Sequence, residues 1–452
     1  MIRIDVLPDD ALLKIFGFYV DMGPNKMPIE AWQSLVHVCR RWRNLVFRSP
    51  RRLNLRLFCR PKTPVKDTLD VWPALPLFVW GNMVLSSDMD NINAALGQSN
   101  RVDEVSLWGL AGWQLEEVLA RMQVPFPELT AMQLWSHDKT PPVVPDSFLG
   151  GSAPRLQYFE LVGIPFPGLP NLLLSADHLV YLRLSDIPHS GYISPEAMVV
   201  LLSVLSSLRT LSLEFQSPQS GPDWGTRSLS PLKRFIIPAL REFQFKGVTE
   251  YIEDLVTYID TPQLDRMHIT FFNQIDFDCP RVAQFINCTP TFMILYEAHV
   301  QFDDYFARVE LPAASGTLEI VISCREPDWQ LSSIEQICNS SFHPLSTVED
   351  LYIEHRYSQL VCENDAIDNT LWLEFLLPFV AVKNLYLSKE FAPSIAAALQ
   401  ELVGAIITEV LPSLRNIFVE WLEPSEYFQE HIGQFVAARQ LSDHPIAISV
   451  WE

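Results

Sequence analysis

The sequence has little glycine and no closely spaced pair of cysteines. Seventeen of its 452 residues are glycine and 34 are proline. This balance argues against a Rossmann-like enzyme and favours many short elements joined by rigid turns. The cysteines form no CxxC pair and are odd in number, so they predict the buried, reduced thiols of an intracellular protein. They are Cys39, Cys59, Cys279, Cys288, Cys324, Cys338 and Cys362.

Positive charge is scarce and unevenly placed. The chain has 33 lysines and arginines against 54 aspartates and glutamates, a net charge of −21. Residues 1–62 carry a net +7, which leaves −28 for residues 63–452. A body this acidic repels phosphate backbones, so we expect no nucleic-acid partner. The basic head needs an explanation of its own.

Long hydrophobic runs are also missing. The longest, residues 395–411, is interrupted by Glu401 and Glu409 and is too short to span a bilayer. The first residues lack the basic segment and apolar core of a signal peptide. These features predict a cytoplasmic or nuclear protein with no membrane partner.

The motifs of common catalytic sites are absent from the sequence. It contains no P-loop, GxSxG or HExxH motif, and none of its ten histidines has the spacing of a metal ligand pair. We therefore expect a non-catalytic protein with no catalytic residue, no metal and no cofactor.

The basic head contains two amphipathic segments. Pro8, Asp9 and Asp10 suit the start of a helix, because proline has no N–H to leave unpaired and acids face the positive end of the helix dipole. The apolar residues that follow predict one stripe of that helix: Leu12, Ile15, Phe16 and Tyr19.

A second helix is predicted over residues 29–47, after a break rich in glycine and proline. Arg40, Arg41 and Arg43 lie off its apolar face and are expected to be solvated. Two such helices bury little area alone, so a partner or the following domain must cover part of them. The residues of the predicted apolar face are Leu35, Val38, Cys39, Trp42, Leu45 and Val46.

The order of residues in this head resembles the F-box, a short helical module that binds the Skp-family adaptor of cullin–RING ubiquitin ligases. The matching pattern is an opening LP, a helix with IF, a variable loop and L..VCRRW, over roughly residues 3–48. The loop is longer than in compact members of the family. The alternative is two core helices of a larger domain. The resemblance implies these adaptor-binding residues: Leu7, Pro8, Leu12, Ile15, Phe16, Leu35, Val38, Cys39 and Trp42.

After residue 50 a pattern of the form LxxLxL keeps returning. Its last three positions alternate as in a strand, and helical segments such as residues 194–207 and 392–413 separate the strands. A repeat near 20–29 residues with this pattern is typical of leucine-rich repeats, although the usual asparagine or cysteine after LxL is mostly missing. The units begin at Val102, Leu129, Leu156, Leu179, Leu208, Leu240, Leu264, Val348, Val382 and Leu414, with weaker ones near residues 292–300 and 317–324.

The predicted fold class is therefore an α/β repeat. A small helical F-box (residues 1–50) precedes an irregular leucine-rich-repeat solenoid (residues 51–452), with parallel strands on the concave face and helices on the convex face. An all-helical repeat fits less well, because the alternating segments are too regular.

An F-box followed by such repeats is similar to fungal substrate-receptor subunits of cullin–RING ligases. The resemblance implies that the head docks the Skp-family adaptor and that the solenoid binds a protein target for ubiquitination. The alternative is a non-catalytic F-box scaffold that binds proteins without directing degradation.

Aromatic residues at outward positions of the predicted strands suggest where a target binds. Trp108 and Trp135 share a position in consecutive units, so they are expected about 5 Å apart, and Tyr158 and Tyr181 share another column close by. Clustered aromatics are typical interface anchors, and we predict that these four bind the target. The alternative is that loops cover the rings or that the rings pack together.

A second, more acidic outward surface is predicted further along the chain. It would favour a basic peptide, although a body with this net charge carries acidic faces in any case. Its outward residues are Asp350, Tyr352, Glu354, Tyr386, Phe418 and Glu420.

Overall fold

The computed structural model divides the chain into two compact units, Met1–Ile193 and Ser194–Glu452, called here the N-terminal and C-terminal units. Cys362 lies outside the described residues. The structure describes residues 7–20, 31–50, 52–62, 64–85, 88–166, 171–218, 234–274, 277–339, 343–355, 369–402, 409–420 and 426–451.

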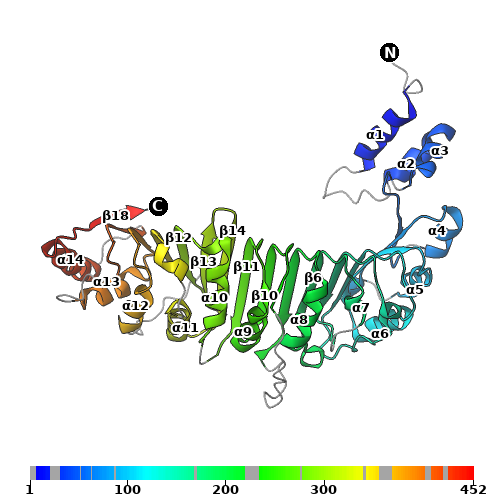
Figure 1. Cartoon of the computed structure of the whole chain (residues 1–452). Helices are drawn as coiled ribbons and strands as arrows, with labels where there is room; N and C mark the ends of the chain where they lie inside the picture. The colour runs from blue at the N-terminus through cyan, green and yellow to red at the C-terminus, as the bar shows by residue number, and fades with distance from the viewer. Residues whose placement is uncertain are drawn as a thin grey trace. The chain divides into compact units, whose positions relative to one another are not determined.

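The N-terminal unit begins with a head of three helices, which a parallel sheet follows. The strand order is β1-β2-β3-β4-β5-β6, and each neighbouring pair is parallel. Helices α5, α6 and α7 lie on one face of this sheet (Figure 1). The elements are α1 (Asp9–Val20), α2 (Ala31–Val38), α3 (Arg40–Arg48), β1 (Leu57–Cys59), α4 (Val65–Val71), β2 (Leu77–Asn82), α5 (Asp90–Leu96), β3 (Val102–Leu110), α6 (Gly112–Arg121), β4 (Ala131–Ser136), β5 (Tyr158–Val162), α7 (Asn171–Leu174) and β6 (Tyr181–Ile187).

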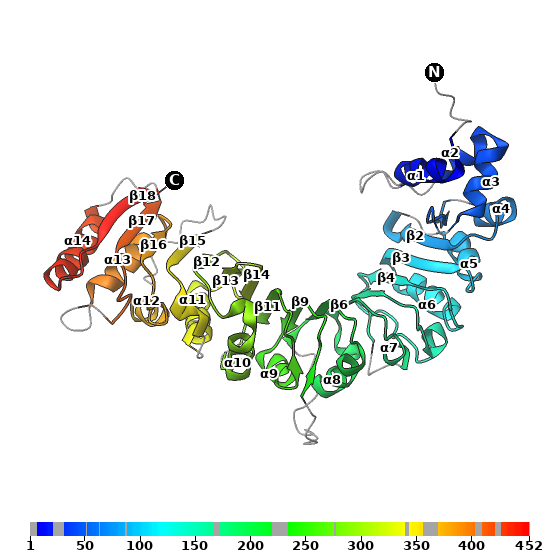
Figure 2. The same cartoon turned by 45° about the horizontal axis from the view of Figure 1, so that its top comes forward.

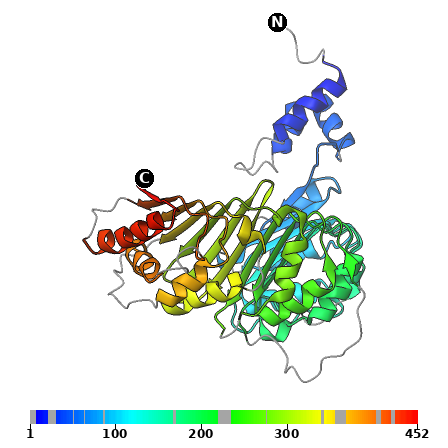
Figure 3. The same cartoon turned by 60° about the vertical axis from the view of Figure 1, so that its left-hand side comes forward.

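The C-terminal unit repeats the same layering. Helices α9, α10 and α11 cover one face of its sheet (Figure 2), and α14 packs on α13 (red and orange in Figure 3). The elements are α8 (Pro195–Val204), β7 (Thr210–Phe215), β8 (Phe235–Ile236), β9 (Glu242–Gly247), α9 (Thr249–Thr257), β10 (Ile259–Asp260), β11 (Arg266–Phe272), α10 (Pro280–Cys288), β12 (Glu297–Phe302), β13 (Phe306–Ala313), β14 (Gly316–Ser323), α11 (Pro327–Asn339), β15 (Asp350–His355), α12 (Asn369–Leu376), β16 (Asn384–Leu387), α13 (Ala392–Gln400), β17 (Asn416–Glu420), α14 (Glu426–Leu441) and β18 (Ala447–Trp451).

The repeat pattern places its apolar positions in the core. In the unit that begins at Leu156, for example, Leu156, Phe159 and Leu161 are at most 1% exposed. Such side chains stack on those of the next strand, because parallel pairing aligns Phe159 with Met132 and with Leu182. The prediction of an α/β repeat with mostly parallel strands is confirmed, and the layering is compatible with a solenoid.

One part of the C-terminal sheet departs from the predicted parallel repeat. Strand β13 is antiparallel to both β12 and β14, and the local order is β11-β14-β13-β12-β15. The weaker units at residues 292–300 and 317–324 were predicted to be consecutive parallel repeats. They instead flank an inserted antiparallel strand, because two tight turns reverse the chain where no helix intervenes.

Candidate functional site

The three helices of the head bury a core of their own. Leu12, Phe16 and Leu35 are at most 6% exposed, and the ring of Phe16 lies 4.7 Å from that of half-buried Trp42. Four residues of the predicted adaptor-binding set therefore hold the head together. Their influence on docking would act through the shape of the head.

The predicted single helix over residues 29–47 is wrong. The chain breaks at Cys39, whose backbone is extended (φ −158°, ψ 169°) and whose sulfur caps α3 by accepting a hydrogen bond from the Trp42 N–H at 3.5 Å. Arg43 Nε donates to the Val36 carbonyl at 3.0 Å, so the end of α2 finds a partner outside the helix. The break shifts the helical phase, and Val38 and Cys39 are exposed instead of lying on the buried face.

The apolar stripe of the first helix is also corrected. Its buried residues are Leu12, Leu13 and Phe16. Ile15 and Tyr19, which were predicted on that stripe, are 45% and 44% exposed, and Phe18 is 77% exposed. Ile15, Phe18 and Tyr19 follow the i, i+3, i+4 spacing and form an uncovered apolar stripe on α1.

Arg40, Arg41 and Arg43 are exposed, as predicted, and Arg41 also makes contacts within the head. The Arg41 guanidinium lies 2.7 Å from a carboxylate oxygen of Asp9 and donates to the Leu7 carbonyl at 2.6 Å. These contacts tie α3 to the residues that start α1. Within the predicted adaptor-binding set, Leu7 is half-buried and Pro8 is exposed.

Trp32 joins the head to the first repeat. It is 1% exposed, its indole N–H donates to the Arg56 carbonyl at 3.1 Å, and its ring lies 5.1 Å from that of Trp72. Arg56 directly precedes β1, so the buried Trp32 side chain connects the head to the first strand of the sheet.

The face of the N-terminal sheet away from its helices carries the outward residues that the repeat pattern predicts. We call it the open face and define it by Glu104, Ala131, Tyr158 and Tyr181, which lie in register across four strands. Several neighbouring outward side chains are nevertheless buried, because they pack on one another: Ser106, Glu160, Val162 and Ser185.

The four predicted target-binding aromatics form two stacks. The rings of Trp108 and Trp135 are 5.5 Å apart with planes at 25°, and those of Tyr158 and Tyr181 are 4.1 Å apart with planes at 4°. The predicted spacing is confirmed. The rings face one another, as the alternative interpretation held, and Trp108 is 36% exposed. They therefore offer edges rather than faces to a partner.

A buried carboxylate organises the centre of the open face. Glu160 is 2% exposed, and it accepts hydrogen bonds from the Tyr158 hydroxyl at 2.8 Å and from Gln133 Nε2 at 3.2 Å. Arg183 lies 3.7 Å from its other oxygen. Burial and the contact with Glu160 raise the pKa of the Tyr158 hydroxyl far above its ordinary value, so Tyr158 stays a donor.

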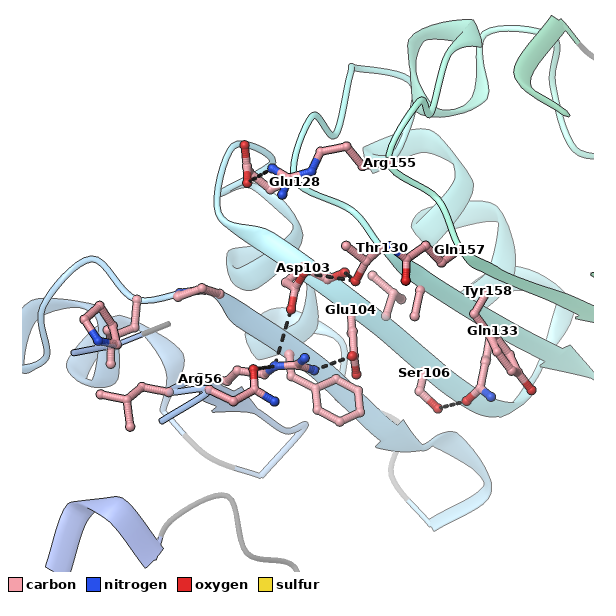
Figure 4. Close-up of a pocket in the computed structure, with 18 of the residues that line it drawn as sticks. Arg56, Asp103, Glu104, Ser106, Glu128, Thr130, Gln133, Arg155, Gln157 and Tyr158 are labelled. Carbon is pink, nitrogen blue, oxygen red and sulfur yellow. Dashed lines mark hydrogen bonds and ion pairs between the residues drawn. The ribbon is translucent and has the colours of Figure 1, made fainter. Parts of the chain in front are cut away.

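A hollow of about 880 Å³ opens beside this network (Figure 4). Glu104, Ala131 and Tyr158 line the hollow from three neighbouring strands, and Ala131 is paired with each of the other two. Arg56 pairs there with Asp103 at 3.3 Å and with Glu104. The residues that line the hollow include no histidine, cysteine or lysine. Its titratable groups are carboxylates, arginines and the Tyr158 hydroxyl.

The predicted acidic surface of the C-terminal unit centres on a row of stacked rings. We call His299, Tyr352, Tyr386 and Phe418 the aromatic ladder. Successive centroids lie 4.5, 4.1 and 4.6 Å apart, and the planes are within 10° of parallel. Trp451 lies edge-on to Tyr352 and Tyr386 at 6.1 and 5.7 Å.

Sequence reasoning missed several residues of these surfaces. His299 occupies an outward position of the weak unit at residues 292–300, so its place in the ladder had a periodic signal. Arg56 and Trp451 also lie in segments that extend the repeat series, LNLRL (residues 53–57) and IAISVW (residues 446–451), but periodicity did not give their contacts with Asp103 and with the ladder.

The described cysteines are all free thiols, and most are buried as predicted. Cys59, Cys279, Cys324 and Cys338 are buried. Burial raises the pKa of the Cys59 thiol to about 11, against the opposing charge of Arg101. Two cysteines contradict the prediction of burial, since Cys39 and Cys288 are exposed.

The described residues hold no group of three or more histidine, cysteine, aspartate or glutamate side chains placed to bind a metal ion. Among the helices of the same residues, none is both long and apolar enough to cross a membrane.

No protein-family model matches the chain, and a search of curated proteins finds no match to it. Arguments about function therefore rest on the residues and contacts described above.

Proposed function

We propose that this chain is the substrate-receptor subunit of a cullin–RING ubiquitin ligase. The F-box-like head would dock the Skp-family adaptor, and the repeat body would hold a protein target. The chain would be non-catalytic, with ubiquitin transfer carried out elsewhere in the complex.

The observation that carries the proposal is the uncovered apolar stripe of the head. The head has its own buried core, yet Ile15, Phe18 and Tyr19 remain 44% to 77% exposed on α1. Exposed apolar groups clustered on one helix face are typical of a protein-docking surface. This stripe lies within the segment whose residue order resembles the F-box, and Pro8 and Val38 of the same pattern are exposed as well.

The body supports the second half of the proposal. In the described part of each unit, the repeat helices lie on one face of the strand layer and leave the other face without them (Figures 1 and 2). The strands carry aromatic and charged side chains on that second face. Rigid strand faces position anchors for a partner at low entropic cost.

Co-purification tests the proposal. The wild-type chain is expected to retain the Skp-family adaptor and the cullin, and Phe18→Glu is expected to abolish retention because it places a charge in the apolar stripe. Leu85→Glu is the matched control, since Leu85 is 73% exposed and lies outside the head. A wild-type chain that fails to retain the adaptor would remove the ligase proposal. Adaptor binding without any change in target abundance on deletion would favour the scaffold alternative.

A further inference from the structure

Carboxylates on the sheet of the C-terminal unit fall into two groups. In one group each has an arginine partner: Arg266 lies 3.2 Å from Glu242, and Arg308 lies 2.5 Å from Glu310 and 2.7 Å from Glu319. In the other group, within the described residues, none has a lysine or arginine partner. That group is Glu297, Asp350, Glu354 and Glu420.

The second group flanks the aromatic ladder on both sides. Two of its members contact the ladder's own histidine, because the His299 ring nitrogens lie 2.6 Å from Glu297 and 4.0 Å from Glu354. Parallel register puts Glu297 and Asp350 in a row before the rings. The same register pairs Gln301 with Glu354 in a second row, on the other side of the rings. Ser388 and Glu420 continue this second row, because each follows directly after the paired Leu387 and Val419. Strands β12, β15, β16, β17 and β18 contain no lysine or arginine. The neighbouring cation Arg308, opposite Gln301 on β13, is paired with Glu310 and Glu319, so within the described residues this surface has acceptors and carboxylates with only His299 among them as a titratable base.

The second row also contains two buried polar groups without partners. Gln301 is 4% and Ser388 is 3% exposed. Gln301 Nε2 donates to Glu354 at 3.0 Å, but among the described residues Gln301 Oε1 and Ser388 Oγ have no hydrogen-bond partner. Buried polar atoms are nearly always paired in folded proteins, so these two oxygens are open to a hydrogen-bond donor, either water or a ligand.

We propose that this face binds an arginine-bearing basic segment of a partner protein. A guanidinium offers five N–H donors and no acceptor, which matches Glu354, Glu420 and the free Gln301 oxygen. The methylene stem of arginine can lie along the ring edges of Tyr352 and Tyr386. The ladder crosses four strands, or about 14 Å, which is the length of about four extended residues.

Other ligand classes fit this face less well. A phosphate or an acidic segment would meet four carboxylates, none of which has a lysine or arginine partner among the described residues. An apolar segment would leave the Gln301 and Ser388 oxygens unpaired and would desolvate the carboxylates. The inference gives the chemical class of the target and rests on the proposed function for that role, although the binding itself does not require the head.

Fluorescence anisotropy with the full chain tests the inference directly. The probe is a fluorescein-labelled glycine–serine peptide with two arginines, and the matched peptide has glutamine at both positions. We expect the double variant Glu354→Gln/Glu420→Gln to weaken arginine-peptide binding by about tenfold. The control Glu242→Gln/Glu310→Gln removes the same charge from paired positions of the same unit, and we expect a change below about threefold.

Ser388→Ala separates binding from folding. It deletes a buried hydroxyl that has no partner, so we expect the midpoint of thermal unfolding to stay or rise while peptide affinity falls by about fivefold. Equal binding of the two peptides would overturn the inference, as would equal losses in the double variant and its control. A chain that retains the adaptor but does not bind the arginine peptide refutes this inference alone. Peptide binding by a chain that fails to retain the adaptor refutes only the proposed function.

Discussion

The hydroxyl of Tyr158 donates a hydrogen bond to the buried carboxylate of Glu160 at 2.8 Å, while its ring stacks on Tyr181 at 4.1 Å. The Tyr158 side chain thus both donates a hydrogen bond to the buried carboxylate of Glu160 and stacks on the ring of Tyr181. The rigidity of the N-terminal open face depends on this double contact.

Replacing Tyr158 by phenylalanine tests that dependence. Tyr158→Phe keeps the stack but removes a donor from Glu160, and we expect the free energy of unfolding to fall by about 1–2 kcal/mol in urea titrations. Tyr296→Phe is the control, because Tyr296 is 64% exposed. Equal stability of both variants and the wild type would mean that Glu160 does not need the Tyr158 hydroxyl.

The link between the head and the sheet depends on Trp32. Trp32→Phe retains a ring but loses the hydrogen bond to the Arg56 carbonyl, so we expect about 1–2 kcal/mol of destabilisation and faster proteolytic cleavage between the head and β1. Trp113, which is 54% exposed, gives the control Trp113→Phe. Cleavage at the wild-type rate in both variants would contradict this role of Trp32.

Acid sensitivity is expected from Glu319. Burial opposes its ionisation, but the hydrogen bond from His268 and the charges of His268 and Arg308 hold its pKa below the ordinary 4.5. A lowered folded-state pKa means that the carboxylate stabilises the fold above pH 4.5 and that this contribution is lost as pH falls through the lower folded value.

Glu319→Gln should therefore lower stability at neutral pH and reduce the loss of stability on acidification. Urea unfolding at a series of acid pH values measures both effects. Glu116→Gln, at an exposed position of α6, should leave the profile unchanged. A Glu319→Gln profile parallel to that of the wild type would contradict the assignment.

Thiol accessibility checks the packing of the described cysteines. Native alkylation followed by peptide mapping should label Cys39 and Cys288 quickly. Cys59 and Cys338 should react only after unfolding, because both are buried and burial raises the pKa of each thiol. Rapid labelling of Cys338 in the folded chain would contradict the described core.

The strands of the body were predictable because two physical periods agree in them. Side chains alternate along each strand, and the pattern recurs from strand to strand, so both the buried leucines and the pairing of Tyr158 with Tyr181 followed from spacing. The reversal at β13 was not predictable, because an antiparallel strand with alternating residues has the same local pattern as a parallel one.

The head was less predictable for a different reason. The residues around Cys39 suit one continuous helical phase, but in the structure the Cys39 sulfur caps α3 and Arg43 donates to the Val36 carbonyl, so local hydrogen bonds accompany a break there. The oxygens of Gln301 and Ser388 are likewise unpaired because no described neighbouring strand places a hydrogen-bond donor beside them. Periodicity places a residue on a face, but it does not give that residue's partners.

The most direct test of the account is the affinity of the full chain for a purified Skp-family adaptor, measured by isothermal titration calorimetry. We predict saturable binding by the wild type and by Leu85→Glu, and at least about tenfold weaker binding by Phe18→Glu. The absence of adaptor binding by the folded wild-type chain, or equal affinities for all three proteins, would contradict the account.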